Sequence, residues 1–233
     1  MKTTILNHKY IEQEITSNAG KEFRYRWSHG ATTKHLGDGM IIYSMMYFFK
    51  PIISVCLGSG GGYIPRIMWS CISDLEQEGF NTDDSRVILV DAVNGVNGHP
   101  DWTDENSFYR KKFLSEWLHS TTEEAYYEFF VKQGIKIDLL HIDADHKYDS
   151  IERDFEMYSN IVSENGIITI HDTDRDYVNN FVEIEGHEGD DLHGPSDFVD
   201  RLDKEKFEVM NFFNYGTKPD FPSSSGLTIV RKK

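Results

Sequence analysis

Residues 52–62 read IISVCLGSGGG, an apolar run that passes directly into a cluster of glycines. The run is short and rich in β-branched residues, which predicts a buried parallel strand ending at Gly58. Residues 63–79 follow with apolar side chains at helical spacing, so the strand leads into a helix. Strand, glycine turn and helix in this order predict the first unit of a parallel α/β sheet.

The alternation of strand and helix continues along the rest of the chain. Further strands are predicted at 86–91, 135–143, 167–171, 207–213 and 227–230, and further helices at 121–132, from 149 onward and at 195–202. Thr121 and Glu124 have the spacing of a capping box, Gly134 ends their helix, and Asn165-Gly166 turns into the next strand. The last two strands bracket a loop rich in Gly, Pro and Ser, which predicts an antiparallel pair. We therefore expect a Rossmann-like, doubly wound α/β fold with a mostly parallel sheet and a C-terminal antiparallel strand pair.

The chain is predicted to form one continuous domain, because it contains no internal repeat and no low-complexity linker. Residues 1–50 are expected to be a helical N-terminal lead-in that includes an aromatic helix at about 39–49. Pro51 separates this lead-in from the Rossmann-like domain at 51–233. The aromatic helix has two interpretations, a contact in a homodimer or packing against the sheet.

Composition and charge exclude several classes of partner. The 24 Lys and Arg against 39 Asp and Glu give a net charge of −15, which repels phosphate groups, so we expect no nucleic-acid and no membrane partner. The first residues lack the apolar core of a signal peptide, and the run at 40–49 is too short for a membrane span, so a cytoplasmic location is predicted. Cys56 and Cys71 have apolar neighbours and are predicted to be buried thiols.

The glycines after the first strand favour binding of a nucleotide or cofactor. They let backbone N–H groups approach a ligand at a helix N-terminus, although an ordinary strand-to-helix turn is the alternative. Tyr63 stands where the dinucleotide fingerprint has its last glycine, and no Gly-Lys-Ser/Thr follows, which disfavours NAD and ATP. Asp91, after the second strand, can accept hydrogen bonds from ribose hydroxyls or can cap a helix.

Two further groups of polar residues follow the later strands. Strand alternation places His141, Asp143 and Asp145 on one side of the chain, and His171 and Asp172 end the next strand. Neighbouring parallel strands lie about 4.8 Å apart, so the carboxylates of Asp143 and Asp172 are near enough to share a divalent cation. Oxygen ligands with one imidazole suit magnesium or manganese. The alternative is acidic strand ends that face water.

Four segments in this order resemble one family. VCLGSGGG, VILVDA, IDLLHIDADHKYDSIERDFEMY and NGIITIHDTD resemble the class I S-adenosylmethionine (SAM)-dependent methyltransferases over about residues 35–174. Within that class, the chain is similar to the metal-dependent O-methyltransferases of the catechol, caffeoyl-CoA and macrolide-sugar type and to the cephalosporin-hydroxylase-like family. The resemblance implies methyl transfer from SAM to a hydroxyl of a small molecule, assisted by a divalent metal, magnesium or manganese.

The resemblance also implies roles for individual residues. The cofactor-binding residues would be Gly58, Ser59, Gly60, Gly62, Asp91, Ala92 and Asp143, and the metal ligands would be Asp143, His171 and Asp172. His146 falls where such enzymes carry a general base, and support of Asp143 is its alternative role. The chain departs from the family pattern at Cys56 and at His171, where acidic residues are common.

Other interpretations stay open from the sequence. A nicotinamide-dependent oxidoreductase on the same fold is one alternative, and an inactive methyltransferase-like binding module is another. The remaining rings have two interpretations each. His29 and His35 are predicted to lie in a surface loop, with a segment folded over the cofactor as the alternative. Trp102, Tyr109 and Trp117 are predicted to belong to the core, with a wall of the adenine site as the alternative.

Overall fold

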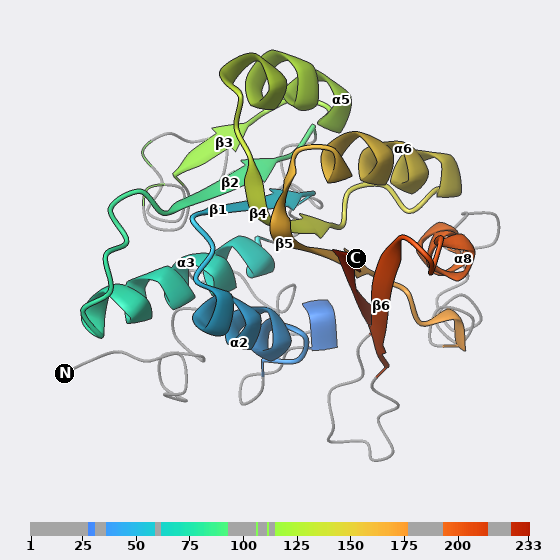
Figure 1. The fold of residues 1–233 in the computed structure, drawn as a ribbon, viewed down its shortest axis with the longest axis horizontal. Helices are drawn as coiled ribbons and strands as arrows, with labels where there is room; N and C mark the ends of the chain where they lie inside the picture. The colour runs from blue at the N-terminus through green and yellow to red at the C-terminus, as the bar shows by residue number, and fades with distance from the viewer. Residues whose placement is uncertain are drawn as a thin grey trace.

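A seven-stranded mixed sheet forms the centre of the molecule (Figure 1). The computed structural model describes residues 28–30, 36–58, 62–92, 106, 111, 115–176, 193–213 and 225–233. The strands are β1 (Ile53–Leu57), β2 (Arg86–Val90), β3 (Glu116–Leu118), β4 (Ile137–Ile142), β5 (Val162–His171), β6 (Phe207–Phe212) and β7 (Leu227–Lys232). Their order is β3-β2-β1-β4-β5-β7-β6; the first five run parallel, and β7 is antiparallel to both β5 and β6. This arrangement confirms the predicted fold class.

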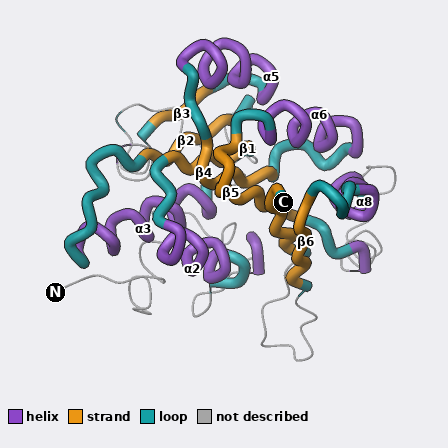
Figure 2. Tube along the Cα trace, in the orientation of Figure 1, coloured by secondary structure: helices purple, strands orange, loops and turns teal. Residues whose placement is uncertain are grey.

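Helices cover both faces of the sheet (Figures 1 and 2). On one face lie α2 (Gly39–Phe49) and α3 (Tyr63–Gln77), and on the other α5 (Thr122–Ala125), the π-helical segment η3 (Tyr126–Val131), α6 (Tyr148–Ser159) and α8 (Gly194–Arg201). Each face has its own apolar core, because alternate residues of a strand point to opposite sides. Cys56 and Leu139 belong to the α2/α3 core, whereas Leu57 and Leu140 belong to the other.

The helix α2 packs part of its surface on α3 and exposes the rest. Ile42 and Met46 are buried in the α2/α3 core, whereas Phe48 and Phe49 are exposed. One face of this helix therefore packs in the core that α2 and α3 share with the sheet, and the homodimer stays a prediction. The separation of a lead-in at residue 50 also stays a prediction; of residues 1–50, the structure describes the short helix η2 (Ser28–Gly30) and residues 36–50.

The structure differs from the predicted elements in two strands. The edge strand β3 was not predicted, because it has only three half-buried residues and no apolar run. The predicted turn at Asn165-Gly166 lies inside β5, where pairing with β4 shifts register between Ile137 and Leu139. The extra residues form a bulge, so a strand predicted to begin at 167 begins at Val162.

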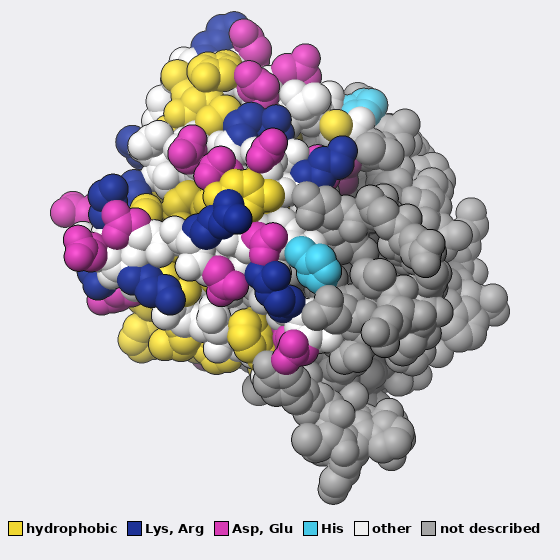
Figure 3. Space-filling view, turned by 90° about the vertical axis from the view of Figure 1, so that its right-hand side faces the viewer, with side chains coloured by type: hydrophobic (Ala, Val, Ile, Leu, Met, Phe, Trp, Pro, Cys, Tyr) yellow, Lys and Arg dark blue, Asp and Glu magenta, His cyan; other side chains and the backbone are white. Residues whose placement is uncertain are grey.

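Two features of the described residues concern the expected absence of membrane and nucleic-acid partners: the length of the helices and the charge of the surface. None of the helices in the described ranges combines the length and apolar character that crossing a bilayer requires. The face in Figure 3 carries Lys and Arg side chains interspersed with Asp and Glu. Cys56 and Cys71 are buried and free, as predicted.

Candidate functional site

The polar residues singled out by the sequence meet at the carboxyl ends of the parallel strands. Leu57 of β1 lies opposite Val90 of β2 and Ile142 of β4, so the residues after these strands are neighbours. The backbone N–H of Gly58 donates to Val90 O over 2.8 Å, and that of Asp143 donates to Leu57 O over 2.9 Å. Ladder bonds thus hold the first residues beyond the strands at one edge, as predicted.

Gly58 is required by the protein itself at this edge. Its φ is +77°, and a Cβ placed on it would lie 2.1 Å from the carbonyl oxygen of Asp143. Only glycine therefore allows β1 and β4 to approach at this point. Gly62, with φ of +78°, is the N-cap of α3, whereas Ser59 and Gly60 lie outside the described residues.

Asp91 and Ala92 follow β2 at the same edge. The N–H of Asp91 donates to Leu118 O over 3.1 Å, which fixes its backbone to the end of β3. Its side chain is half-buried, and the Ala92 carbonyl lies 3.2 Å from Nε2 of His119. Trp117 is half-buried against the α2/α3 core and stacks on His119, which supports the predicted core role; Trp102 and Tyr109 lie outside the described residues.

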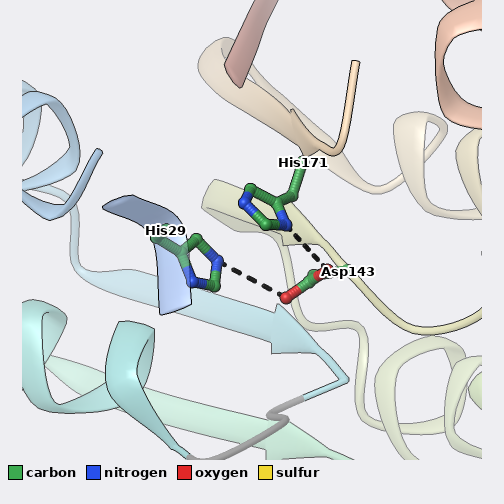
Figure 4. Close-up of side chains that lie close together, drawn as sticks. All are labelled: His29, Asp143 and His171. Carbon is green, nitrogen blue, oxygen red and sulfur yellow. Dashed lines mark hydrogen bonds and ion pairs between the residues drawn. The ribbon is translucent and has the colours of Figure 1, made fainter. Parts of the chain in front are cut away.

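Three histidines surround the carboxylate of Asp143, which follows β4. His171 Nδ1 lies 3.2 Å from Oδ1, and His29 Nε2 lies 3.4 Å from Oδ2, so two rings face different oxygens (Figure 4). His146 Nε2, from the turn before α6, lies 3.5 Å from Oδ1. The Asp143 side chain is only 13% exposed, so this carboxylate is the centre of a largely buried cluster.

Asp172 joins the cluster through two of the same histidines. Its Oδ1 lies 3.2 Å from His171 Nδ1, and its Oδ2 lies 3.2 Å from His146 Nε2. Its φ is +57°, a conformation that side chains other than glycine rarely adopt. Such strain persists where surrounding contacts require it, which is common at functional sites.

Mutual ionisation holds the cluster together. Burial alone would raise the pKa of Asp143, but the charge of His171 and hydrogen bonds from the three histidines lower it well below its ordinary value. Burial likewise opposes ionisation of Asp172, yet the same His171 charge and hydrogen bond lower its pKa to about 2. The pKa of His171 is raised well above its ordinary value: burial lowers it, and the charges of Asp172 and Asp143 more than offset that effect.

His146 is the histidine of the cluster that solvent reaches most easily. Its side chain is 33% exposed, whereas that of His171 is 8% exposed. Burial lowers the pKa of His146, but the hydrogen bond to Asp143 and the charge of Asp172 raise it above its ordinary value. Two carboxylates therefore stabilise the protonated form of a ring that a ligand can reach.

The prediction of a surface loop for His29 is wrong, and this residue was missed as part of the site. His29 is 5% exposed and stacks on His171, with ring centroids 3.8 Å apart. The N–H of Asp38 donates to the His29 carbonyl over 2.9 Å and so ties this turn to the start of α2. The polar, Gly-containing segment around His29 gives no periodicity from which this tertiary contact can be inferred. His35 lies outside the described residues.

The donor atoms fit a divalent metal ion. Two sets of described residues have ligand atoms within 4.8 Å of one another: His29, Asp143 and His171, and also Asp143, His146 and Asp172. Carboxylate oxygens and imidazole nitrogens are ordinary ligands of divalent ions. The predicted ligands are divided between these sets: Asp143 and His171 belong to the first and Asp143 and Asp172 to the second, each with one further histidine. Nδ1 of His171 lies 3.2 Å from an oxygen of each carboxylate.

Comparison with known proteins identifies the family. The profile of a family described as a methyltransferase domain matches residues 55–173, just over half of the chain. The chain belongs to this methyltransferase family. The matched segment begins in β1 and ends directly after Asp172, so it contains the glycine turn, Asp91 and most of the Asp143 cluster. The predicted resemblance to class I methyltransferases is confirmed.

Solved structures show the same fold at low sequence identity. An O-methyltransferase from Bacillus cereus, in complex with S-adenosylhomocysteine (SAH), has a TM-score of 0.61 and 15% identity over 84% of this chain and 80% of its own. The O-methyltransferase TomG from Streptomyces achromogenes, involved in tomaymycin synthesis and in complex with SAM, has a TM-score of 0.60 and 12% identity over 84% and 79%. A putative caffeoyl-CoA O-methyltransferase from Staphylococcus aureus has a TM-score of 0.56 and 12% identity over 84% and 82%. No curated protein matches the sequence significantly.

Proposed function

We propose that this methyltransferase transfers the methyl group of SAM to a hydroxyl oxygen of a small molecule, assisted by a divalent cation. The observation that carries the proposal is the position of His146, which lies within 3.5 Å of both Asp143 and Asp172 and is one-third exposed. A base that a hydroxyl can reach, next to carboxylates that hold a cation, suits O-methylation.

The cofactor side of the proposal rests on the ends of β1, β2 and β4. Asp91 stands where a carboxylate accepts both ribose hydroxyls, and the glycine turn precedes the N-terminus of α3. We assign Gly58, Ser59, Gly60, Gly62, Asp91, Ala92 and Asp143 to this side. The structural neighbours from B. cereus and S. achromogenes, which are in complex with SAH and SAM, support this choice of cofactor.

His146 would act as the general base. In this role its neutral ring accepts the hydroxyl proton. Nε2 of the resulting imidazolium faces Asp143 and Asp172, whose carboxylates stabilise the positive charge. The acceptor oxygen is then in position to attack the methyl group, and much of the rate would come from holding the two in line. SAM supplies an activated methyl group on its sulfonium.

Asp143, His171 and Asp172 would hold the cation, with magnesium or manganese as the ions expected from the sequence. A bound cation would favour loss of the hydroxyl proton and fix the orientation of the acceptor. Asp143 links the two halves of the site, because its backbone contacts Gly58 and its side chain contacts His146. We also propose that the acceptor is a small molecule and that the protein binds neither nucleic acid nor a membrane. The protein would act as a monomer or as a homodimer.

Calorimetric titration with SAH, in magnesium and again in EDTA, tests the proposal. We expect micromolar binding, about −8 kcal/mol, in both buffers, because the cation serves the acceptor and not the cofactor. Asp143→Ala should abolish metal-dependent turnover. SAH binding should stay largely intact, because Asp143 meets Gly58 on the cofactor side through its backbone, which the substitution retains. Absence of SAH binding in both buffers would overturn the proposal. The nicotinamide alternative is disfavoured by the match to a methyltransferase family.

A further inference from the structure

His29 combines a buried ring with a strained backbone. It sits in the short helix η2 with φ of +57°, which is unfavourable for a side chain with a Cβ, and its ring is nonetheless buried. Its Nε2 points at Asp143 Oδ2, on the side of the carboxylate opposite to the oxygen that His171 faces (Figure 4). Two imidazoles thus converge on one carboxylate.

We propose that His29 is a ligand of the cation, so that His29, Asp143 and His171 form a set of two imidazoles and one carboxylate. The inference rests on the proposed function and changes two of its parts. His29 takes the place of Asp172 among the ligands, and the metal is a first-row transition ion of the iron-to-zinc range instead of magnesium or manganese. Ligand bonds of about 2.0–2.2 Å place donor atoms up to about 4.4 Å apart. The three donors here lie within 4.8 Å of one another, which is close to this spacing.

A second, independent feature is the environment of the other nitrogen of His171. Its Nε2 lies 3.2 Å from Ser225 Oγ and 3.9 Å from the buried carboxylate of Asp38. Histidines that ligate metals through one nitrogen almost always donate from the other to a carboxylate, carbonyl or water, which fixes the ring. Nδ1 of His171 is thereby directed toward Asp143 and the proposed ion.

Asp38 connects both histidine ligands to the fold. Its backbone N–H donates to the His29 carbonyl over 2.9 Å, and its carboxylate faces His171. It is also the N-cap residue of α2, whose inner face is buried on α3. The start of α2 therefore positions both imidazoles. Residues that contact the ligands of a metal site and orient them commonly have this role.

The donor types determine which ion is preferred. Magnesium binds oxygen ligands and keeps much of its water, whereas imidazole favours iron, cobalt, nickel, copper and zinc. Replacing an oxygen ligand with a second histidine therefore shifts selectivity away from magnesium. Two imidazoles and one carboxylate leave coordination positions open, and an acceptor hydroxyl can occupy one of them.

Cobalt(II) titration of the full-length protein tests the inference without any measurement of turnover. Visible absorption reports cobalt binding, and magnesium competition gives the selectivity between the two ions. For the wild-type protein we expect cobalt to bind at least about 100-fold more tightly than magnesium. In His29→Gln, cobalt affinity should fall at least about tenfold while magnesium affinity falls much less. His119→Gln, which removes an exposed histidine outside the cluster, should leave both affinities unchanged.

His29→Gly is a second variant that suits the backbone, because glycine adopts a φ of +57° without strain. Added imidazole should restore its cobalt spectrum if the missing ring was a ligand. Equal loss of cobalt and magnesium affinity in both variants, or no loss of either, would overturn the inference and leave His29 a packing residue. SAH calorimetry on the same samples separates the two proposals: binding of SAH without cobalt selectivity overturns only the role of His29.

Discussion

At position 58, the fold itself requires glycine, independently of any ligand. Ala at this position meets two penalties, the positive φ and the contact with the Asp143 carbonyl. We expect Gly58→Ala to lower the free energy of unfolding by about 2–4 kcal/mol. Urea denaturation measures this loss of stability, and SAH calorimetry on the same variant measures any change in cofactor affinity.

Gly134 supplies the matched control. Its φ is +66°, but a Cβ there would have nothing within 4 Å, so Gly134→Ala meets only the first penalty. We expect a loss of about 1–2 kcal/mol for this variant. Equal losses for the two variants would show that the close approach of β1 and β4 at Gly58 is not what excludes a side chain.

His146 carries the sharpest prediction for activity. Loss of a general base lowers turnover by about 10²–10⁴-fold, so His146→Gln should lose kcat on this scale while its SAH affinity is retained. The base must be neutral, and its pKa is raised by Asp143 and Asp172 against the effect of burial. In EDTA, where no cation competes for Asp143 and Asp172, the residual kcat of the wild-type enzyme should therefore fall as the pH drops through this raised pKa.

The pH profile distinguishes a base from a positioning residue. His146→Gln should lose the acidic limb of the kcat profile together with its rate. If the variant is slow but keeps the same limb, another group titrates and His146 only supports Asp143.

The sequence predicted part of this site for a physical reason. Asp143, Asp172 and His146 directly follow buried strands or lie within one turn of them, and strand ends meet at one edge by geometry alone. His29 was not predicted, because its contact with Asp143 depends on how α2 packs on α3 and not on any local pattern.

At the scale of elements, strands were predictable from the sequence where side chains on both faces of the strand are buried. Four of the five residues of both β1 and β2 are buried, and their continuous apolar runs mark them in the sequence. The strand β3 has only half-buried residues, so its sequence shows no apolar pattern. It is held in the sheet by the backbone pairing of residues 116–118 with β2. The start of β5 was hidden because its bulge contains Asn165-Gly166, a pair typical of turns.

The capping box of α5 is a prediction confirmed in full and open to measurement. Thr121 Oγ1 accepts from the Glu124 N–H, and the Glu124 side chain accepts from the Thr121 N–H. Thr121→Ala should lower the free energy of unfolding by about 1 kcal/mol, whereas Thr121→Ser should retain most of it. Urea denaturation measures both, and no difference between Ala and Ser would show that the cap contributes little.

For the whole molecule, the strand order connects the proposed cofactor side to the proposed acceptor side. β1 lies between β2 and β4, and β4 lies between β1 and β5, so every proposed site residue except His29 ends or follows one of four adjacent strands. The antiparallel pair β6 and β7 extends the far side of β5 and buries Val230 against it. A ligand bound at this edge would contact the ends of the central strands, and we expect these strands to separate only when the whole sheet unfolds.

Cofactor binding should therefore raise the melting temperature of the whole domain and not of one part. SAH at 100 times its Kd stabilises the folded state by about 2.7 kcal/mol, which corresponds to roughly 5–11 °C for a chain of this length. Differential scanning calorimetry should show one transition that moves by this amount, and Asp91→Asn should reduce the shift. NADH at the same concentration should produce none, because the last glycine of the dinucleotide fingerprint is replaced by Tyr63, whose ring is buried in the α2/α3 core. A shift with NADH and none with SAH would favour the oxidoreductase, since ligand binding stabilises only the state that contains its site.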